Sequence, residues 1–165
     1  MADCTSAAGA SRGKRRGEAR RPWGVAVRQA PIGPAASPGL VSAVSAAGGI
    51  GCLGASWTDL PALREQIRAV GRSTDRSFCV NLVLAFEQGE RLEVVAEEGV
   101  AMGSFSWGVE APLVARAHAA GGLVPAQMAP AGAARPAGRA GRDAVVAHGV
   151  AAGGRAWLLR HRAGL

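Results

Sequence analysis

Residues 49–54 spell GIGCLG, which matches the GxGxxG pattern that many proteins use to bind the pyrophosphate of a dinucleotide. That fingerprint places its glycines in the turn after a strand, where they open a helix whose N-terminus meets the phosphates. Here the glycines follow a predicted helix and lie within a predicted strand. No acid follows on a second strand at the required distance, because Asp75 lies beyond the next predicted helix. We therefore interpret these glycines as small residues that let a strand pack tightly against its surroundings.

Cysteines and histidines are the other residues whose types could carry out chemistry. Cys4, Cys52 and Cys79 are widely spaced and include no CxxC pair, which is expected of a reduced protein and argues against a disulfide scaffold. Cys52 and Cys79 lie in predicted strands, where small buried thiols are common, so neither is assigned as a nucleophile. His118 ends a predicted helix and is expected to be solvated or to interact with the helix C-terminus. His161 is given no role, and no metal site is predicted.

The charge of the chain is concentrated near its two ends. The net charge of its 165 residues is +7, but residues 1–22 hold six Lys and Arg against two acids, and residues 155–165 hold three Arg and no acid. The other 132 residues carry ten basic and ten acidic side chains. A neutral body of this kind argues against a nucleic-acid partner. With 48% apolar residues, the length fits one globular domain.

The N-terminal residues 1–22 are mostly Ala, Gly, Ser and Arg, so we expect a disordered basic extension. A signal peptide needs a longer apolar core than the run that Arg28 interrupts, so a cytoplasmic location is expected, although the composition also fits a transit peptide. Residues 29–58 carry no charge, but they contain three Pro and six Gly. A membrane-spanning helix is therefore not expected there, and no membrane partner is predicted.

Short apolar runs alternate with amphipathic stretches along the body of the chain. The apolar runs predict strands at residues 24–30, 49–55, 78–84, 100–105, 123–127 and 143–148. Helical spacing predicts helices at residues 38–47, 59–70, 87–98 and 111–120, with Ser37 and Asp59 as the expected caps of the first two. Successive strand centres lie 20–29 residues apart, which indicates repeated βα units and a parallel α/β fold. The spacing is compatible with a doubly wound sheet or a (β/α)8 barrel, and the Pro and Gly content of residues 129–141 makes a fifth helix doubtful.

Five short segments in this order and spacing resemble the nitronate monooxygenase family, formerly called 2-nitropropane dioxygenases. The segments are residues 29–33 (QAPIG), 42–54 (SAVSAAGGIGCLG), 80–82 (VNL), 100–108 (VAMGSFSWG) and 144–154 (AVVAHGVAAGG). Flavin-type enoyl-acyl-carrier reductases are similar in the same segments. The resemblance implies an FMN-dependent (β/α)8 TIM-barrel type of fold, here incomplete with about six βα units. The partial barrel is expected at residues 23–155, followed by a tail at residues 156–165 that does not resemble the family.

The resemblance also implies an activity and a binding site for FMN. The activity is oxidation of a small-molecule alkyl nitronate by flavin and O2, which yields a carbonyl compound and nitrite. The cofactor-binding residues implied by the matching motifs are Pro31, Ile32, Gly33, Asn81, Gln127, His148, Gly153 and Gly154. The amide of Asn81 can both donate and accept hydrogen bonds with the flavin ring, or else bonds backbone at a strand end. His148 either contacts the cofactor, substitutes as a base or is a polar strand end, and Trp107 either walls a substrate pocket or caps the barrel rim.

Two departures from the family pattern bear on catalysis. Arg155 stands where the family has its expected catalytic His, and an Arg side chain cannot accept a proton at neutral pH, so no catalytic residue is assigned. Ala151 replaces the acid of the same motif. The chain is also shorter than the roughly 250 residues of a whole barrel, so loops that usually hold the flavin phosphate are expected to be missing.

These departures predict an impaired flavoenzyme, for which a non-catalytic barrel remnant or a fragment completed by a partner chain is the alternative. An open sheet would leave unpaired edges that favour self-association.

Overall fold

The computed structural model describes residues 24–25, 27–108, 110–128, 141 and 143–147. Its centre is a five-stranded sheet of β1 (Cys52–Gly54), β2 (Cys79–Val83), β3 (Met102–Ser106), β4 (Pro125–Met128) and β5 (Ala144–Ala147). Every strand pairs in parallel with the next strand along the chain. A doubly wound sheet reverses its strand order at a switch point. The uninterrupted order β1-β2-β3-β4-β5 is instead that of a barrel wall, so the fold is an incomplete barrel of the (β/α)8 type.

The first predicted strand, residues 24–30, is reduced to one parallel bridge between Arg28 and Ile50. The ladder ends there because the Gln29 side chain takes over the pairing with the backbone of Cys52. Its Oε1 accepts from the Cys52 N–H at 3.1 Å, and its Nε2 donates to the Cys52 carbonyl at 3.2 Å. The segment nevertheless lies parallel beside β1, as the barrel order requires. The other five predicted strands are all present, with ends shifted by one to three residues.

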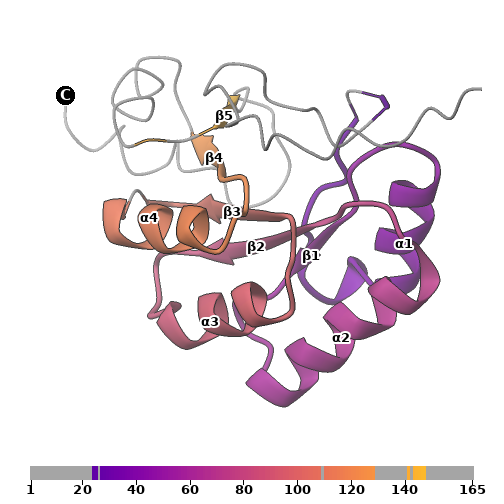
Figure 1. The fold of residues 1–165 in the computed structure, drawn as a ribbon, viewed down its shortest axis with the longest axis horizontal. Coiled ribbons are helices and arrows are strands. Elements are labelled where there is room, and N and C mark those ends of the chain that lie inside the picture. The colour runs from indigo at the N-terminus through magenta and orange to yellow at the C-terminus, as the bar shows by residue number, and fades with distance from the viewer. Residues whose placement is uncertain (1–23, 26, 109, 129–140, 142, 148–165) are drawn as a thin grey trace, which may run out of the picture.

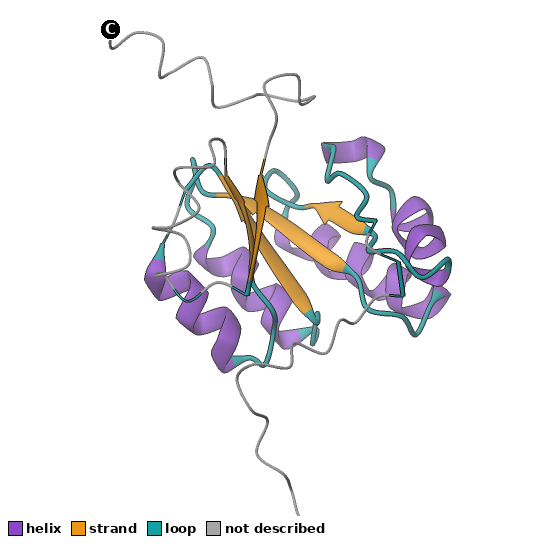
Figure 2. Ribbon diagram, turned by 90° about the horizontal axis from the view of Figure 1, so that it is seen from above, coloured by secondary structure: helices purple, strands orange, loops and turns teal. Residues whose placement is uncertain are grey.

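Four α-helices and one short 3-10 helix connect the described strands. They are η1 (Gly33–Ala35), α1 (Pro38–Ala46), α2 (Leu60–Ser73), α3 (Gly89–Glu97) and α4 (Ala111–Ala119), with α1–α4 along one face of the sheet (Figures 1 and 2). The expected caps are confirmed: Ser37 Oγ accepts from Leu40 N at 3.3 Å, and Asp59 Oδ1 accepts from Ala62 N at 2.8 Å. These bonds satisfy N–H groups that lack an intrahelical partner.

Side chains alternate between the two faces of each strand, which divides the core into two clusters. The larger cluster lies between the sheet and the helices, where Leu53, Val80 and Phe105 from three successive strands are at most 1% exposed. The smaller cluster occupies the face without helices and consists of Ile50, Cys52, Cys79 and Met102, with Leu123 packed against it. That second face corresponds to the interior of a barrel.

The last turn of α4 is tied to the start of β5. His118 Nε2 lies 2.8 Å from Asp143 Oδ2, and the same oxygen accepts from the N–H of Val124 at 2.7 Å. The expectation that His118 is solvated or interacts with the helix C-terminus did not include Asp143, because Asp143 approaches only when the sheet is assembled. Among the described residues no helix is long and apolar enough to cross a membrane.

Several expectations fall on residues outside the described part of the chain. They are the basic extension at 1–22, the doubtful helical segment at 129–141 (of which only residue 141 is described), the residues 148–154 and the tail at 156–165. The division into domains stays a prediction.

Candidate functional site

The candidate site lies where the strands end on the face of the sheet that carries no helices. In a barrel of parallel strands all carboxyl ends meet at one rim, and the loops after the strands build the site there. Gly54 ends β1, and the loop that carries Pro31, Ile32 and Gly33 lies against it. A Cβ atom on Gly54 would come within 3.0 Å of both the carbonyl oxygen of Pro31 and the backbone nitrogen of Gly33. The close approach of this loop therefore depends on the absence of a side chain at residue 54.

Asn81 lies on the same face, one strand away from that loop. It pairs with Gly54 in the parallel register of β1 and β2, so the two residues point to the same side of the sheet. The structure thus brings Asn81 and the 31–33 loop together, as the resemblance implies. One detail was wrong: Asn81 is in the middle of β2 rather than at its end, because the strand continues to Val83.

Two serine hydroxyls of β3 hold the side-chain amide of Asn81. Ser104 Oγ donates to Asn81 Oδ1 at 2.7 Å, and Ser106 Oγ donates to the same oxygen at 3.0 Å. Asn81 is only 3% exposed, and both serines are buried as well. A carbonyl-type oxygen has two acceptor positions, so this oxygen is saturated. Sequence reasoning expected an amide that both donates and accepts toward a ligand, whereas the structure leaves only the donating Nδ2 for that purpose.

The other predicted site residues are placed less fully. Gln127 is the third residue of β4 and pairs in register with Ser106 and Val146. His148, Gly153 and Gly154 lie outside the described residues, as does Arg155 at the position of the expected catalytic His. Trp107 follows β3 directly and has a φ of 63°, in the left-handed region that a bulky side chain rarely adopts. Such strain costs about 1–3 kcal/mol and concentrates at functional sites.

Sequence reasoning missed the role of Arg28. The guanidinium NH2 of Arg28 donates to Ser104 Oγ at 2.6 Å and lies 3.2 Å from the sulfur of Cys52 and 3.7 Å from that of Cys79. Its Nε is buried and has no hydrogen-bond partner among the described residues. The available signal was a single charged residue inside the predicted strand at residues 24–30.

The pKa values of the two neighbouring thiols shift in opposite directions. Burial raises the pKa of Cys79, but the hydrogen bond from the Cys52 thiol and the positive charge of Arg28 oppose burial, and the pKa is lowered to about 7. Burial raises the pKa of Cys52 well above its ordinary value, and the hydrogen bond with Cys79 adds to that rise. Of the two thiols beside the guanidinium, Cys79 is therefore the more acidic.

We expect the lowered pKa of Cys79 to make folding stability depend on pH. The pKa of Cys79 is lower in the folded chain than the ordinary value of 9.0, so its contribution is complete above about pH 9 and is lost as the pH falls through 7. The free energy of unfolding, measured by urea denaturation between pH 6 and about 8.5, should therefore rise with pH. Cys79→Ser should flatten this rise, whereas Cys4→Ser should not change it. A rise of equal size in Cys79→Ser would show that Cys79 does not ionise in this range.

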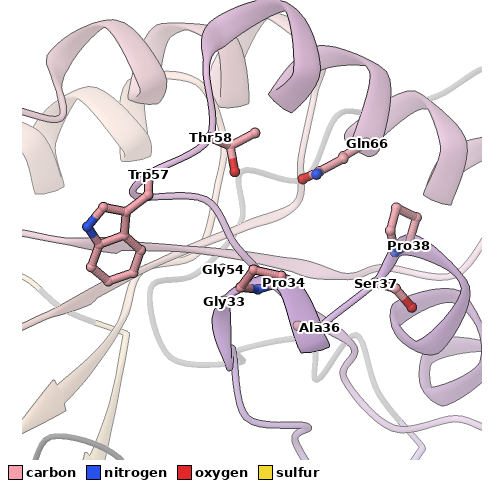
Figure 3. Close-up of a pocket in the computed structure, with 9 residues that line it drawn as sticks. All are labelled: Gly33, Pro34, Ala36, Ser37, Pro38, Gly54, Trp57, Thr58 and Gln66. Atoms are coloured by element: carbon pink, nitrogen blue, oxygen red, sulfur yellow. The ribbon is translucent and has the colours of Figure 1, made fainter.

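A hollow lies beside the 31–33 loop, toward the helices. It has a volume of about 260 Å³ and is lined by Gly33, Pro34, Ala36, Ser37, Pro38, Gly54, Trp57, Thr58 and Gln66. The side chains of Thr58 and Gln66 face the loop across this cavity (Figure 3). Trp57, at its margin, is 65% exposed and makes an edge-to-face contact with Phe86, with ring centroids 6.0 Å apart. Both aromatic residues belong to loops that follow strands, so they add an apolar border to the rim.

Comparisons with known proteins agree with this geometry. Residues 23–89 match the family model described as Nitronate monooxygenase. The chain is 36% identical over 129 residues to a Mycobacterium tuberculosis protein named (3aS,4S,5R,7aS)-5-hydroxy-7a-methyl-1-oxo-octahydro-1H-indene-4-carboxyl-CoA dehydrogenase. A Rhodococcus jostii protein of the same name is 31% identical over 129 residues. Each match covers 78% of this chain but only 36% of the relative, so the chain spans about a third of the length of these proteins.

Solved structures show the same fold. A mutant of FabK from Thermotoga maritima superposes with a TM-score of 0.73 at 32% identity, covering 77% of this chain and 44% of that one. Nitroalkane oxidase from Streptomyces ansochromogenes superposes with a TM-score of 0.72 at 28% identity, covering 80% of this chain and 48% of that one. With the matching strand order and the family model over residues 23–89, these findings show that the chain has the fold of these proteins and is similar to the nitronate monooxygenase family.

Proposed function

We propose that this chain forms an FMN-binding part of an oxidoreductase that converts an alkyl nitronate and O2 into a carbonyl compound and nitrite. The observation that carries the proposal is the meeting of the 31–33 loop, Gly54 and the Asn81 amide at one rim of a parallel sheet. The match of residues 23–89 to the Nitronate monooxygenase family model supports it.

The residues present fit a flat, polar-edged ring such as that of a flavin. Gly54 presents no side chain toward the loop, and the loop backbone passes over it at close range. Asn81 Nδ2 can donate a hydrogen bond, which suits the carbonyl oxygens and ring nitrogens of a flavin. The chemistry that FMN supplies when bound is electron transfer between substrate and O2, and the protein positions it and excludes other reactions. Because Arg155 cannot act as a base, we propose that turnover by this chain is impaired.

The visible spectrum of the purified chain tests the proposal. Bound flavin should give absorption bands near roughly 370 and 450 nm, and the released cofactor should be FMN. A chain that stays colourless after reconstitution with FMN would contradict the proposal and favour a remnant that binds no flavin.

Asn81→Ala should weaken FMN binding about tenfold or more, because one hydrogen bond to a ligand is worth about 1.5 kcal/mol. Titration of FMN into the apoprotein, followed by flavin fluorescence, measures this change. Ser73→Ala, on the exposed surface of α2, is the matched control and should leave the affinity unchanged. Equal FMN affinities of Asn81→Ala and the unaltered chain would remove Asn81 from the site.

A second candidate function is dehydrogenation of a CoA thioester, because both curated relatives above are named as CoA dehydrogenases. The two candidates are separated by mixing the FMN-loaded chain with an alkyl nitronate or with an acyl-CoA under anaerobic conditions. The substrate that bleaches the flavin bands identifies the reaction class.

A further inference from the structure

The guanidinium of Arg28 reaches into the barrel interior, on the face of the sheet that carries the candidate site. Its NH2 is within 2.6 Å of the hydroxyl oxygen of Ser104, a residue 76 positions later in the chain. The sulfur atoms of Cys52 and Cys79 lie 3.2 and 3.7 Å from the same nitrogen. These three residues come from β1, β2 and β3, so the side chain of Arg28 spans the interior face of three neighbouring strands.

The guanidinium of Arg28 determines which hydrogen bonds Ser104 accepts and which it donates. Arg has only N–H donors and no acceptor, so the Ser104 oxygen must accept from Arg28. The single hydroxyl proton of Ser104 is then free to be donated onward, and Asn81 Oδ1 lies 2.7 Å away. Since Ser106 fills the second acceptor position of Oδ1 at 3.0 Å, the oxygen of the amide is held toward β3.

The orientation of the amide follows from this order of donors. Oδ1 and Nδ2 lie on opposite sides of the same planar group, so an oxygen held toward β3 directs Nδ2 away from β3. The strand on that side is β1, whose last residue, Gly54, lies against the 31–33 loop. We propose that Arg28 is a positioning residue that acts through Ser104 to present Asn81 as a hydrogen-bond donor to an acceptor atom of the bound ring. This inference rests on the proposed function in taking FMN as the ligand.

Replacing Arg28 by residues with other donor properties tests the relay in the full chain. Arg28→Met and Ser104→Ala each remove the directed bond, and each should weaken FMN binding about tenfold, the change expected when one hydrogen-bonded group loses its orientation. The double variant should bind FMN no more weakly than Ser104→Ala alone, because both changes interrupt the same path. Arg28→Lys keeps a side chain that can donate hydrogen bonds but cannot accept them, so it should retain part of the FMN affinity that Arg28→Met loses. Arg116→Met removes a surface Arg that pairs with Glu93 and is the matched control.

A second measurement reads the amide directly. Asn81 is the only asparagine of the chain, so labelling with 15N-asparagine gives a single pair of side-chain amide proton signals by NMR. These signals should be well separated in the apoprotein and should converge in Arg28→Met and Ser104→Ala, while Arg116→Met leaves them in place. Unchanged signals and FMN affinities within about twofold in both relay variants would overturn the inference.

The two measurements also separate the inference from the function on which it rests. A chain that binds no FMN, but whose amide signals respond to Arg28→Met and Ser104→Ala, would retain the relay and lose the proposed ligand. A chain that binds FMN with the same affinity in all variants would retain the ligand and lose the relay.

Discussion

Gly51→Ala should destabilise the fold by about 3 kcal/mol or more, near the upper end of the cost of overpacking a core. A Cβ at residue 51 would lie 2.1 Å from the carbonyl oxygen of Val41, and 2.7 and 2.8 Å from its carbonyl carbon and Cα. All three atoms are backbone of α1, so no side-chain rotation can relieve the clash. The backbone nitrogen of Gly51 also donates to Ser45 Oγ at 3.1 Å, and displacement of α1 would break this bond.

Urea denaturation of the unaltered chain and of Gly51→Ala measures the change in the free energy of unfolding. Gly103→Ala is the control variant. Gly103 is a buried residue of β3, where an added Cβ would meet no atom within 4 Å. The same substitution there should change the free energy of unfolding by less than about 1 kcal/mol. A similarly small effect at both glycines would show that α1 does not pack against residue 51 as described.

This result would also bear on the GxGxxG pattern. In a dinucleotide fingerprint the middle glycine lets the backbone approach a pyrophosphate. Here Gly51 lets α1 approach the chain just before β1, and the motif follows a helix instead of opening one. The prediction that these glycines allow close packing is confirmed, and the pattern is not a dinucleotide fingerprint.

Phe105→Ala should cost about 3–5 kcal/mol, the range observed when a fully buried aromatic side chain is truncated. Phe105 is 0% exposed and belongs to the core between the sheet and the helices, among Leu82, Val114 and Val124. It lies between Ser104 and Ser106, so its packing also anchors the strand that holds the Asn81 amide. The neighbouring side chains are packed between the sheet and the helices, so they can fill only part of the cavity that the ring would leave.

Phe86→Ala is the matched control, since Phe86 is 52% exposed and contacts Trp57 at the rim. Its loss should change the free energy of unfolding by no more than about 1 kcal/mol. Thermal and urea unfolding of the two variants provide the comparison. Equal losses in stability would mean that Phe105 does not occupy the core position assigned to it.

Much of the fold was predictable from local patterns. Apolar runs of strand length alternate with helical spacing, and these periods depend only on which side chains face a core. Ser37 and Asp59 were recognised as helix caps because a cap bonds the backbone three residues later, within the same short segment. The strand order was open between two topologies, because spacing along the chain does not state which strands become neighbours.

The interior of the site was less predictable. Asn81 was identified through the resemblance of its segment, but its partners Ser104 and Ser106 follow 23 and 25 residues later. Whether they reach Oδ1 depends on the register between β2 and β3, which places Asn81 beside Ser104. For the same reason the saturated acceptor of the amide could not be foreseen from residue types.

The sequence by itself determined the order of helices and strands, the helix caps and the glycines that allow close packing, because each depends on local backbone preference or on a short repeat. Only the tertiary structure decided that the sheet is singly wound and that Arg28 meets Cys52, Cys79 and Ser104 across 24, 51 and 76 residues of chain. Contacts over such separations exist only after parallel strands have paired in one register, which brings every second side chain to the same face. The donor character of the candidate site is therefore a property of the assembled sheet.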